Sequence, residues 1–143
     1  MAAQFRYQRR VQFHETDLAG IVHFSWYFKY MEEAEHALWR SVGMSIAPPD
    51  PTFGFPRVNA TCDFKAPLKF EDEVEVHIAV ERLGRRSIKY ACTLKRGSDI
   101  VATGSMTSAC VTRDPNGRVQ SIDVPESVRS RLTQDGVLPS RRA

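Results

Sequence analysis

The most regular hydrophobic pattern in the chain has the period of a helix and begins near residue 25. Apolar side chains recur about every 3.6 residues at Tyr27, Tyr30, Met31, Ala34, Leu38 and Val42. Most charged residues of this stretch fall off the stripe. Ser25 suits the N-cap position, and Gly43 suits the position that follows the last turn. The pattern predicts an amphipathic helix of about 17 residues, or about 26 Å in length.

Beyond this helix the pattern changes to that of strands. A proline-rich connector at 45–55 is incompatible with a helix. Short turns at 84–85 and 97–99 favour antiparallel hairpins. Within 73–83, four aliphatic residues alternate with Glu, His and Ala, which is typical of a strand with one buried face. Strands are therefore predicted at 57–70, 73–83, 86–96 and 99–113.

Weaker signals lie at both ends of the chain. Residues 5–13 have the aromatic and β-branched content of a strand but alternate poorly. A turn is predicted at "DPNG" (114–117), and a short amphipathic helix at 125–133 that starts on Pro125. This order of elements favours an α+β fold, with an antiparallel sheet wrapped around one long central helix. One helix leaves sheet surface uncovered, so we expect a dimer or a higher assembly.

Length and composition are those of an ordinary globular protein. The 143 residues are expected to form a single domain, 1–143, with 42% hydrophobic and 26% charged residues. No apolar run approaches the roughly 20 residues that span a bilayer, and the first ten residues lack the apolar segment of a secretory signal. We therefore expect a cytoplasmic protein without membrane contact. Three cysteines without C-x-x-C spacing are interpreted as small buried hydrophobic residues: Cys62, Cys92 and Cys110.

Positive charge is unevenly distributed. The net charge is only +3, but 82–96 holds six basic residues and no acidic residue. This segment is either a solvated strand surface or a patch for a ligand that carries phosphate. No nucleic-acid-binding motif accompanies the charge, so nucleic acid is not an expected partner.

The segment "HETDLAGIVHF" (14–24) places the carboxylate of Asp17 among apolar residues just before the helix. A solvated loop is normally more polar. Asp17 therefore either bonds backbone N–H groups of a turn or belongs to a site. The ligand types of His14, Glu15, Asp17 and His23 suit zinc or iron, but no fixed metal-binding spacing is met, and no metal is predicted.

The pattern D-x-x-G-x-V-x-F-x-x-Y, formed by Asp17, Gly20, Val22, Phe24 and Tyr27, resembles the signature of the 4-hydroxybenzoyl-CoA thioesterase family. The resemblance extends over nearly the whole chain, to about residue 112. Members of that family have the hotdog fold, in which an antiparallel sheet wraps around a central helix. The resemblance implies an acyl-CoA thioesterase that works as a homodimer or homotetramer, with its active site at the subunit interface. Coenzyme A is then part of the substrate, and no separate cofactor is expected.

The resemblance assigns the catalytic carboxylate to Asp17. It also assigns the donor that holds the thioester carbonyl to the backbone N–H of Phe24 or its neighbour. Helix N-termini supply such donors together with the positive end of the dipole, and a donor of this kind contributes about 3 to 4 kcal/mol in other acyl-transfer enzymes. Gly20 permits a tight turn or a close approach by the substrate. Whether Asp17 attacks the thioester or activates water is open at this point.

Substrate contacts are expected at Gly20, Val22, His23, Phe24 and Tyr27, with Tyr27 lining the acyl pocket. Many bacterial relatives carry a histidine seven residues after the aspartate, where this chain has Phe24. Here the histidine comes one position earlier, which argues against a His-assisted mechanism and towards the branch with aromatic acyl groups. His23 is then either a residue near the pocket or an ordinary surface histidine. The aromatic residues at 26–30 fit an aromatic acyl pocket or simply the core.

Phosphates of CoA are expected to contact Arg85, Arg86 and Ser87, on the turn into a predicted strand, with Lys89 and Arg113 as weaker candidates. Two other functions are compatible with the same residues. An acyl-ACP thioesterase would use the basic segment to bind an acidic carrier protein. A non-catalytic acyl-binding module is the alternative outside the enzymes, since one fold supports several functions.

Overall fold

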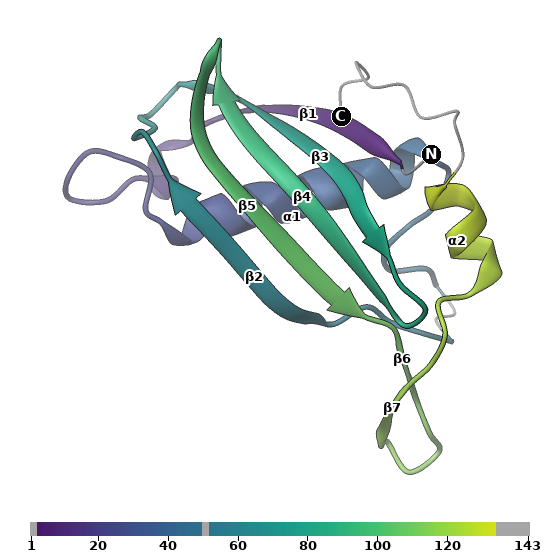
Figure 1. Ribbon diagram of the computed structural model, residues 1–143. Helices are drawn as coiled ribbons and strands as arrows, with labels where there is room; N and C mark the ends of the chain where they lie inside the picture. The colour runs from purple at the N-terminus through teal and green to yellow at the C-terminus, as the bar shows by residue number, and fades with distance from the viewer. Residues whose placement is uncertain (1–2, 50–51, 134–143) are drawn as a thin grey trace.

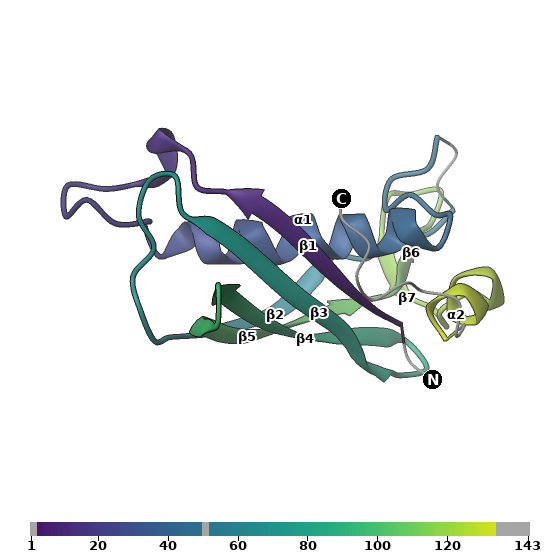
Figure 2. The same cartoon turned by 90° about the horizontal axis from the view of Figure 1, so that it is seen from above.

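A five-stranded antiparallel sheet with a long helix along one of its faces makes up most of the molecule (Figures 1 and 2). The computed structural model describes residues 3–49 and 52–133. The sheet has the order β1-β3-β4-β5-β2, so β1 and β2 are its edges. The elements are β1 (Gln4–Arg10), α1 (Ser25–Ser41), β2 (Arg57–Phe64), β3 (Glu73–Leu83), β4 (Ser87–Arg96), β5 (Asp99–Ala109), β6 (Val111–Arg113), β7 (Val119–Ser121) and α2 (Glu126–Leu132).

Helix α1 packs its predicted apolar stripe into the core. All six residues of the stripe, from Tyr27 to Val42, are buried. The helix ends as predicted, because Gly43 adopts the left-handed conformation (φ 82°) that a residue after the last turn often needs. The predicted N-cap was wrong by one residue. Ser25 is the first helical residue, and Phe24 occupies the cap position without a side-chain hydrogen bond.

The sheet shows the predicted alternation. Val74, Val76, Ile78 and Val80 of β3 are buried, and the residues between them are more exposed. Cross-strand register aligns them with the buried residues of β4, for example Ile78 opposite Cys92. The predicted turns at 84–85 and 97–99 join β3 to β4 and β4 to β5. The inner face of the sheet and the buried face of α1 thus form one continuous core.

Three predicted strands have different limits in the structure. The first strand ends at Arg10, and residues 13–15 form a turn of 3₁₀ helix. The strand predicted at 57–70 ends at Phe64, because the N–H groups of Lys65 and Ala66 both donate to the carbonyl of Val101 instead of continuing the ladder. The strand predicted at 99–113 is interrupted at Cys110, whose backbone bonds Arg86 and Ile122. Strand β7, which pairs with β6, was not predicted.

The predicted α+β class with an antiparallel sheet and a helix is confirmed. The helical part consists of α1 and the short α2, so a sheet around a single helix describes it only in part. Helix α2 was predicted to within a residue at each end. Cys92 and Cys110 are buried as predicted, whereas Cys62 is half-buried. No helix in the described part of the chain is long and apolar enough to cross a membrane.

The contact between β5 and α1 leaves no space for an added methyl group at Gly104. A Cβ there would lie 2.5 Å from the carbonyl oxygen of Thr61 and 2.8 Å from the sulfur of Met31. We expect Gly104→Ala to lower the free energy of unfolding by about 1 to 3 kcal/mol, as overpacked cores do. Urea denaturation measures this. Gly54→Ala is the control, because a Cβ at Gly54 meets no atom within 4 Å. Equal stability of the two variants would contradict this view of the interface.

Candidate active site

The segment that carries Asp17 folds back on itself as a tight hairpin. Thr16 pairs with Val22, and the N–H of Asp17 donates to the carbonyl of Ile21 at 2.9 Å. At the tip, the N–H of Gly20 donates to the carbonyl of Asp17, also at 2.9 Å. Gly20 has a φ of 79°, and a Cβ at this position would meet nothing within 4 Å. The conformation of the turn, rather than lack of space, therefore favours glycine here.

The side chain of Asp17 is exposed and takes part in the turn. Its Oδ1 accepts a hydrogen bond from the N–H of Ala19 at 2.9 Å. The structural role that the sequence left open is therefore present. It does not exclude a chemical role, because a carboxylate has several acceptor sites. Oδ2 has no hydrogen-bond partner within the part of the chain that the structure describes.

One backbone donor at the start of α1 is unused. The N–H of His23 donates to the carbonyl of Glu15 at 2.9 Å, and the N–H of Trp26 donates to the carbonyl of His23 at 3.0 Å. The N–H of Ser25 lies 3.3 Å from Nδ1 of His23. The N–H of Phe24 has no acceptor among residues 3–49 and 52–133. It lies at the positive end of the helix dipole, where an oxyanion is stabilised.

A largely apolar hollow of about 410 Å³ lies between this hairpin, the start of α1 and the segment after β2. Its lining includes three of the predicted substrate contacts, Val22, Phe24 and Tyr27, but not Gly20 or His23. The ring of Tyr27 meets that of Phe64 edge-on, with centroids 4.9 Å apart. Burial raises the pKa of Tyr27, so its hydroxyl stays neutral. The hollow is completed by Ile21, Phe64, Lys65, Ala66 and Pro67.

His23 is exposed and supports the first turn of the helix. Its Nδ1 lies 2.8 Å from Oγ of Ser25, and its ring tilts over that of Phe24 with centroids 4.6 Å apart. When Nδ1 accepts from the backbone of Ser25, the neutral ring carries its proton on Nε2. The histidine therefore acts on the helix start and on the orientation of Phe24, rather than as a wall of the hollow.

Glu15 was considered in the sequence only as a metal ligand, and its position in the structure is different. It is 1% exposed, and both of its oxygens accept hydrogen bonds from Arg9 at 2.7 to 2.8 Å. Arg9 follows Phe5 and Tyr7 on the inward face of β1, which explains the poor alternation of that strand. The signal for this pair in the sequence was therefore an arginine at a position of β1 where the alternation of the strand places inward-facing residues.

The predicted CoA contacts lie at the other end of the sheet. Arg85 and Arg86 are on the turn between β3 and β4, and Ser87 begins β4. The 11 residues of β3 span about 36 Å between this turn and the end of the sheet next to the Asp17 hairpin (Figure 1). Arg86 donates to Asp123 at 2.9 Å and thereby lowers the pKa of that carboxyl. One chain does not bring these residues to Asp17.

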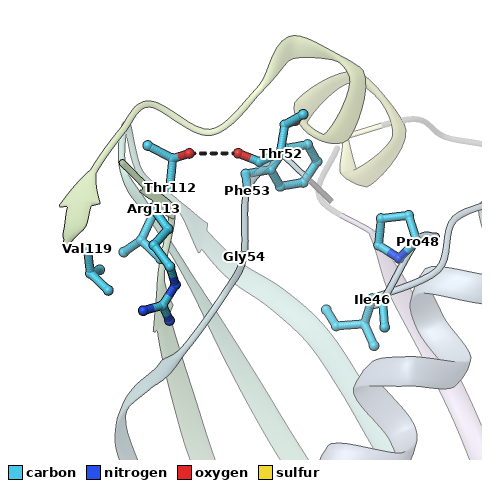
Figure 3. A pocket seen from close by; sticks show the side chains of 10 residues that line it. Ile46, Pro48, Thr52, Phe53, Gly54, Thr112, Arg113 and Val119 are labelled. Atoms are coloured by element: carbon cyan, nitrogen blue, oxygen red, sulfur yellow. Dashed lines mark hydrogen bonds between the residues drawn. The ribbon is translucent and has the colours of Figure 1, made fainter. Parts of the chain in front are cut away.

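A second hollow, of about 610 Å³, lies at that far end between the connector before β2 and the β6–β7 ribbon (Figure 3). Phe53, Ile46 and Pro48 line one side, and Arg113 and Val119 line the other. Thr112 closes it through a hydrogen bond to the carbonyl of Thr52 at 2.8 Å. It is larger than the hollow next to the Asp17 hairpin, and neither hollow has a carboxylate or imidazole among its lining residues. It lies at the opposite end of the sheet from Asp17, so that carboxylate is not available to it.

Two other kinds of site are not supported. In the described part of the chain, one group has metal-ligand geometry, Glu32, Glu35 and His36, and the guanidinium of Arg57 already lies 2.8 Å from Glu35 and 3.6 Å from Glu32. The loop residues first considered as ligands form no such group. Burial raises the pKa of Cys92 to about 12 and that of Cys62 to about 11, so neither thiol is a ready nucleophile near neutral pH.

Comparison with known proteins gives this geometry a family. Residues 19–103 match the model of the Thioesterase superfamily, a region that begins two residues after Asp17. A presumed esterase of Aquifex aeolicus is 39% identical over 119 residues, which cover 82% of this chain and 91% of that protein. The chain belongs to the thioesterase superfamily. It is therefore placed among thioester hydrolases, as predicted.

Two similar proteins of this superfamily have named substrates. The structure of a gentisyl-coenzyme A thioesterase has a TM-score of 0.79 and 32% identity, over 90% of this chain and 99% of that one. A 1,4-dihydroxy-2-naphthoyl-CoA hydrolase of Synechococcus elongatus is 27% identical over 112 residues, or 76% of this chain and 82% of that protein. The chain shares the hotdog fold of these enzymes. These matches do not single out the narrower 4-hydroxybenzoyl-CoA group.

Two phenylalanines of equal exposure should differ in their effect on substrate binding if the hollow next to the Asp17 hairpin is the acyl site. Phe64 and Phe70 are both 49% exposed, but only Phe64 lines the hollow, whereas Phe70 meets the ring of Phe13. We expect Phe64→Ala to raise the KM for an aromatic acyl-CoA at least about fivefold, because an aromatic contact contributes roughly 1 kcal/mol beyond its buried area. Phe70→Ala should leave it unchanged. Steady-state kinetics measure both, and equal effects would exclude the hollow as the acyl site.

Proposed function

We propose that this protein hydrolyses acyl-CoA thioesters with aromatic acyl groups to the free acid and CoA. The observation that carries the proposal is the exposed carboxylate of Asp17 on the hairpin that leads into α1, together with the N–H of Phe24 at the helix N-terminus, which has no acceptor among the described residues. The aromatic and aliphatic lining of the adjacent hollow supports an aryl group. The aromatic substrates in the names of the two relatives support it as well. A 4-hydroxybenzoyl group falls within this class.

In the proposed mechanism, the thioester carbonyl accepts a hydrogen bond from the N–H of Phe24. The donor stabilises the negative charge that develops on the oxygen when the carbonyl carbon becomes tetrahedral. The C–S bond then breaks, and CoA leaves as a thiolate that takes up a proton. The protein supplies this donor already in place, so no reorganisation of the donor is needed during the reaction.

Asp17 has two roles that are chemically consistent with this geometry. As a nucleophile, it attacks the carbonyl carbon and forms an anhydride, which water then hydrolyses. As a base, it takes a proton from a water molecule that attacks the same carbon. Both routes consume one water and give one carboxylic acid and one thiol. The free acceptor capacity of Oδ2 serves either route.

The proposal includes a homodimer or a homotetramer. Strand β2 is an edge of the sheet that pairs on one side with β5, and no described strand pairs with its other side. Val58 and Phe64 of this strand are exposed apolar residues. The CoA contacts at Arg85, Arg86 and Ser87 require such an assembly, because about 36 Å of strand separates them from the Asp17 end of the same chain. A partner subunit would supply them.

The acyl-ACP alternative is less well supported than its basic segment suggested. Several of those cations already have acidic partners, with Arg86 bound to Asp123, Lys89 to Glu81 and Arg96 to Asp72. Less unpaired positive charge is then available for an acidic carrier protein. CoA requires only a few phosphate contacts, and Arg86 would exchange its exposed pair with Asp123 for one of them.

Replacement of the carboxylate tests the function directly. We expect Asp17→Asn to keep the fold, because the amide oxygen can still accept from the N–H of Ala19. We expect kcat for aromatic acyl-CoA to fall by about a hundredfold or more, since the amide is neither a nucleophile nor a base. A thiol-detecting assay on a panel from acetyl-CoA to benzoyl-CoA measures this. Turnover near that of wild type would remove Asp17 from the chemistry.

Replacement of an arginine tests the CoA contacts. We expect Arg86→Ala to raise the KM for acyl-CoA roughly fivefold with little change in kcat, which is the effect of losing one exposed charged contact of about 1 kcal/mol. The difference should shrink at high salt. Arg82→Ala is the control, because Arg82 is an exposed arginine of the same basic segment outside the proposed contacts. Equal KM values for the two variants would limit Arg86 to its surface pair with Asp123.

A further inference from the structure

We infer that Glu15 is a positioning residue of the active site, whose buried carboxylate fixes the Asp17 hairpin against the N-terminus of α1. This inference rests on the function proposed above. Glu15 lies two residues before Asp17, yet it is buried where Asp17 is exposed. It therefore acts through the geometry of its neighbours and not on the substrate.

The carboxylate of Glu15 is held from three separate segments. Arg9 of β1 donates to both of its oxygens. The hydroxyl of Tyr30 of α1 donates to Oε1 at 2.7 Å, and the backbone N–H of Gln12 donates to the same oxygen at 2.9 Å. His14 also lies 3.8 Å from Oε2. Sheet, helix and hairpin thus meet at one side chain.

The backbone of Glu15 holds the two reacting elements together. Its carbonyl accepts the N–H of His23 at 2.9 Å, so the start of the hairpin is tied to the residue just before Phe24. Thr16 and Val22 pair immediately beyond this bond. The hydrogen bond between Glu15 and His23 is therefore close to both groups. Asp17 comes two residues after Glu15, and Phe24 comes directly after His23.

Charged contacts hold the carboxylate of Glu15 in place. A buried carboxylate that is paired and fully hydrogen-bonded is stable, but one with a missing partner is not. Arg9 is itself fixed, because it contacts Glu33 at 3.0 Å and lies 4.3 Å above the ring of Tyr30. Burial and the hydrogen bond to Glu15 raise the pKa of Tyr30, which keeps its hydroxyl a donor. Any displacement of Glu15 would therefore break several charged contacts at once.

The molecule contains a matched control. Glu35 of α1 is also buried, at 2% exposed, and forms the same two-pronged pair with Arg57, at 2.8 and 3.0 Å. Tyr90 lies near this pair: burial, and after it the charge of Glu35, raise the pKa of Tyr90, and its hydroxyl accepts a hydrogen bond from Trp39 at 2.9 Å. This second triad joins α1 to β2 and β4, and it shares no residue with the Asp17 hairpin. The main difference between the two groups is their location: the Glu15 group contacts the Asp17 hairpin, and the Glu35 group does not.

The test compares Glu15→Gln with Glu35→Gln. Each variant places an amide N–H₂ against the donors of an arginine, so both should lower the melting temperature. We expect kcat for an aromatic acyl-CoA to fall about 10- to 100-fold in Glu15→Gln, because small displacements of reacting groups have effects of this size. The KM should change less than threefold. In Glu35→Gln, measured well below its melting temperature, we expect kcat within twofold of wild type.

Equal losses of kcat in the two variants would overturn the inference, since they would show general destabilisation. A normal kcat in Glu15→Gln would overturn it as well. If Glu15→Gln does not fold, Tyr30→Phe replaces it, with Tyr90→Phe as the control. We then expect a smaller loss of kcat in Tyr30→Phe and a kcat close to that of wild type in Tyr90→Phe.

Amide hydrogen exchange separates this inference from the proposed function. We expect faster exchange at residues 16–23 in Glu15→Gln and unchanged exchange there in Glu35→Gln. A wild-type protein that released no thiol from any CoA thioester would refute the proposed function. The exchange result would then decide alone whether Glu15 anchors the hairpin: selective acceleration would support it, and identical exchange in both variants would overturn it.

Discussion

The packing of α1 against the inner face of the sheet is the interaction on which the rest of the structure depends. It buries the apolar stripe of the helix and sets where its N-terminus points. Apolar contacts alone allow a helix to slide by part of a turn, because they are not directional. The two buried glutamate–arginine pairs are directional, and they tie α1 to opposite edge strands, Glu15 and Tyr30 to β1 and Glu35 to β2. Together they fix the helix along its axis.

Most of the fold could be predicted because its helix and strands have apolar residues at regular intervals in the sequence. The stripe of α1 and the alternation of β3 are of this kind, and so is the glycine that ends α1. Strand ends were harder to predict, because they depend on hydrogen bonds between distant segments, such as those from Lys65 and Ala66 to Val101. The buried pairs were not predicted. The inward position of Arg9 on β1 was the one signal for them, and Glu15 and Glu35 resemble surface residues until a partner from another element is known.

The candidate site shows the same division. A local motif grouped Asp17, Val22, Phe24 and Tyr27. In the structure Asp17 lies in the hairpin, and Val22, Phe24 and Tyr27 line the adjacent hollow. Local sequence did not reveal that His23 would bond the helix start instead of lining the hollow, because this depends on which way a ring turns. Phe64 was missed for a different reason: it contacts Tyr27 from β2, 37 residues further along the chain.

The burial of the cysteines has a consequence for the environment that such an enzyme creates. Each turnover of a CoA thioesterase releases a small thiol, and oxidised thiols form mixed disulfides with any protein thiolate within reach. Cys92 and Cys110 are enclosed by the core, and burial raises the pKa of all three cysteines, so the thiolate that would attack is scarce. With the proposed function, the same packing that holds the sheet to α1 would protect Cys92 and Cys110 from modification by released CoA.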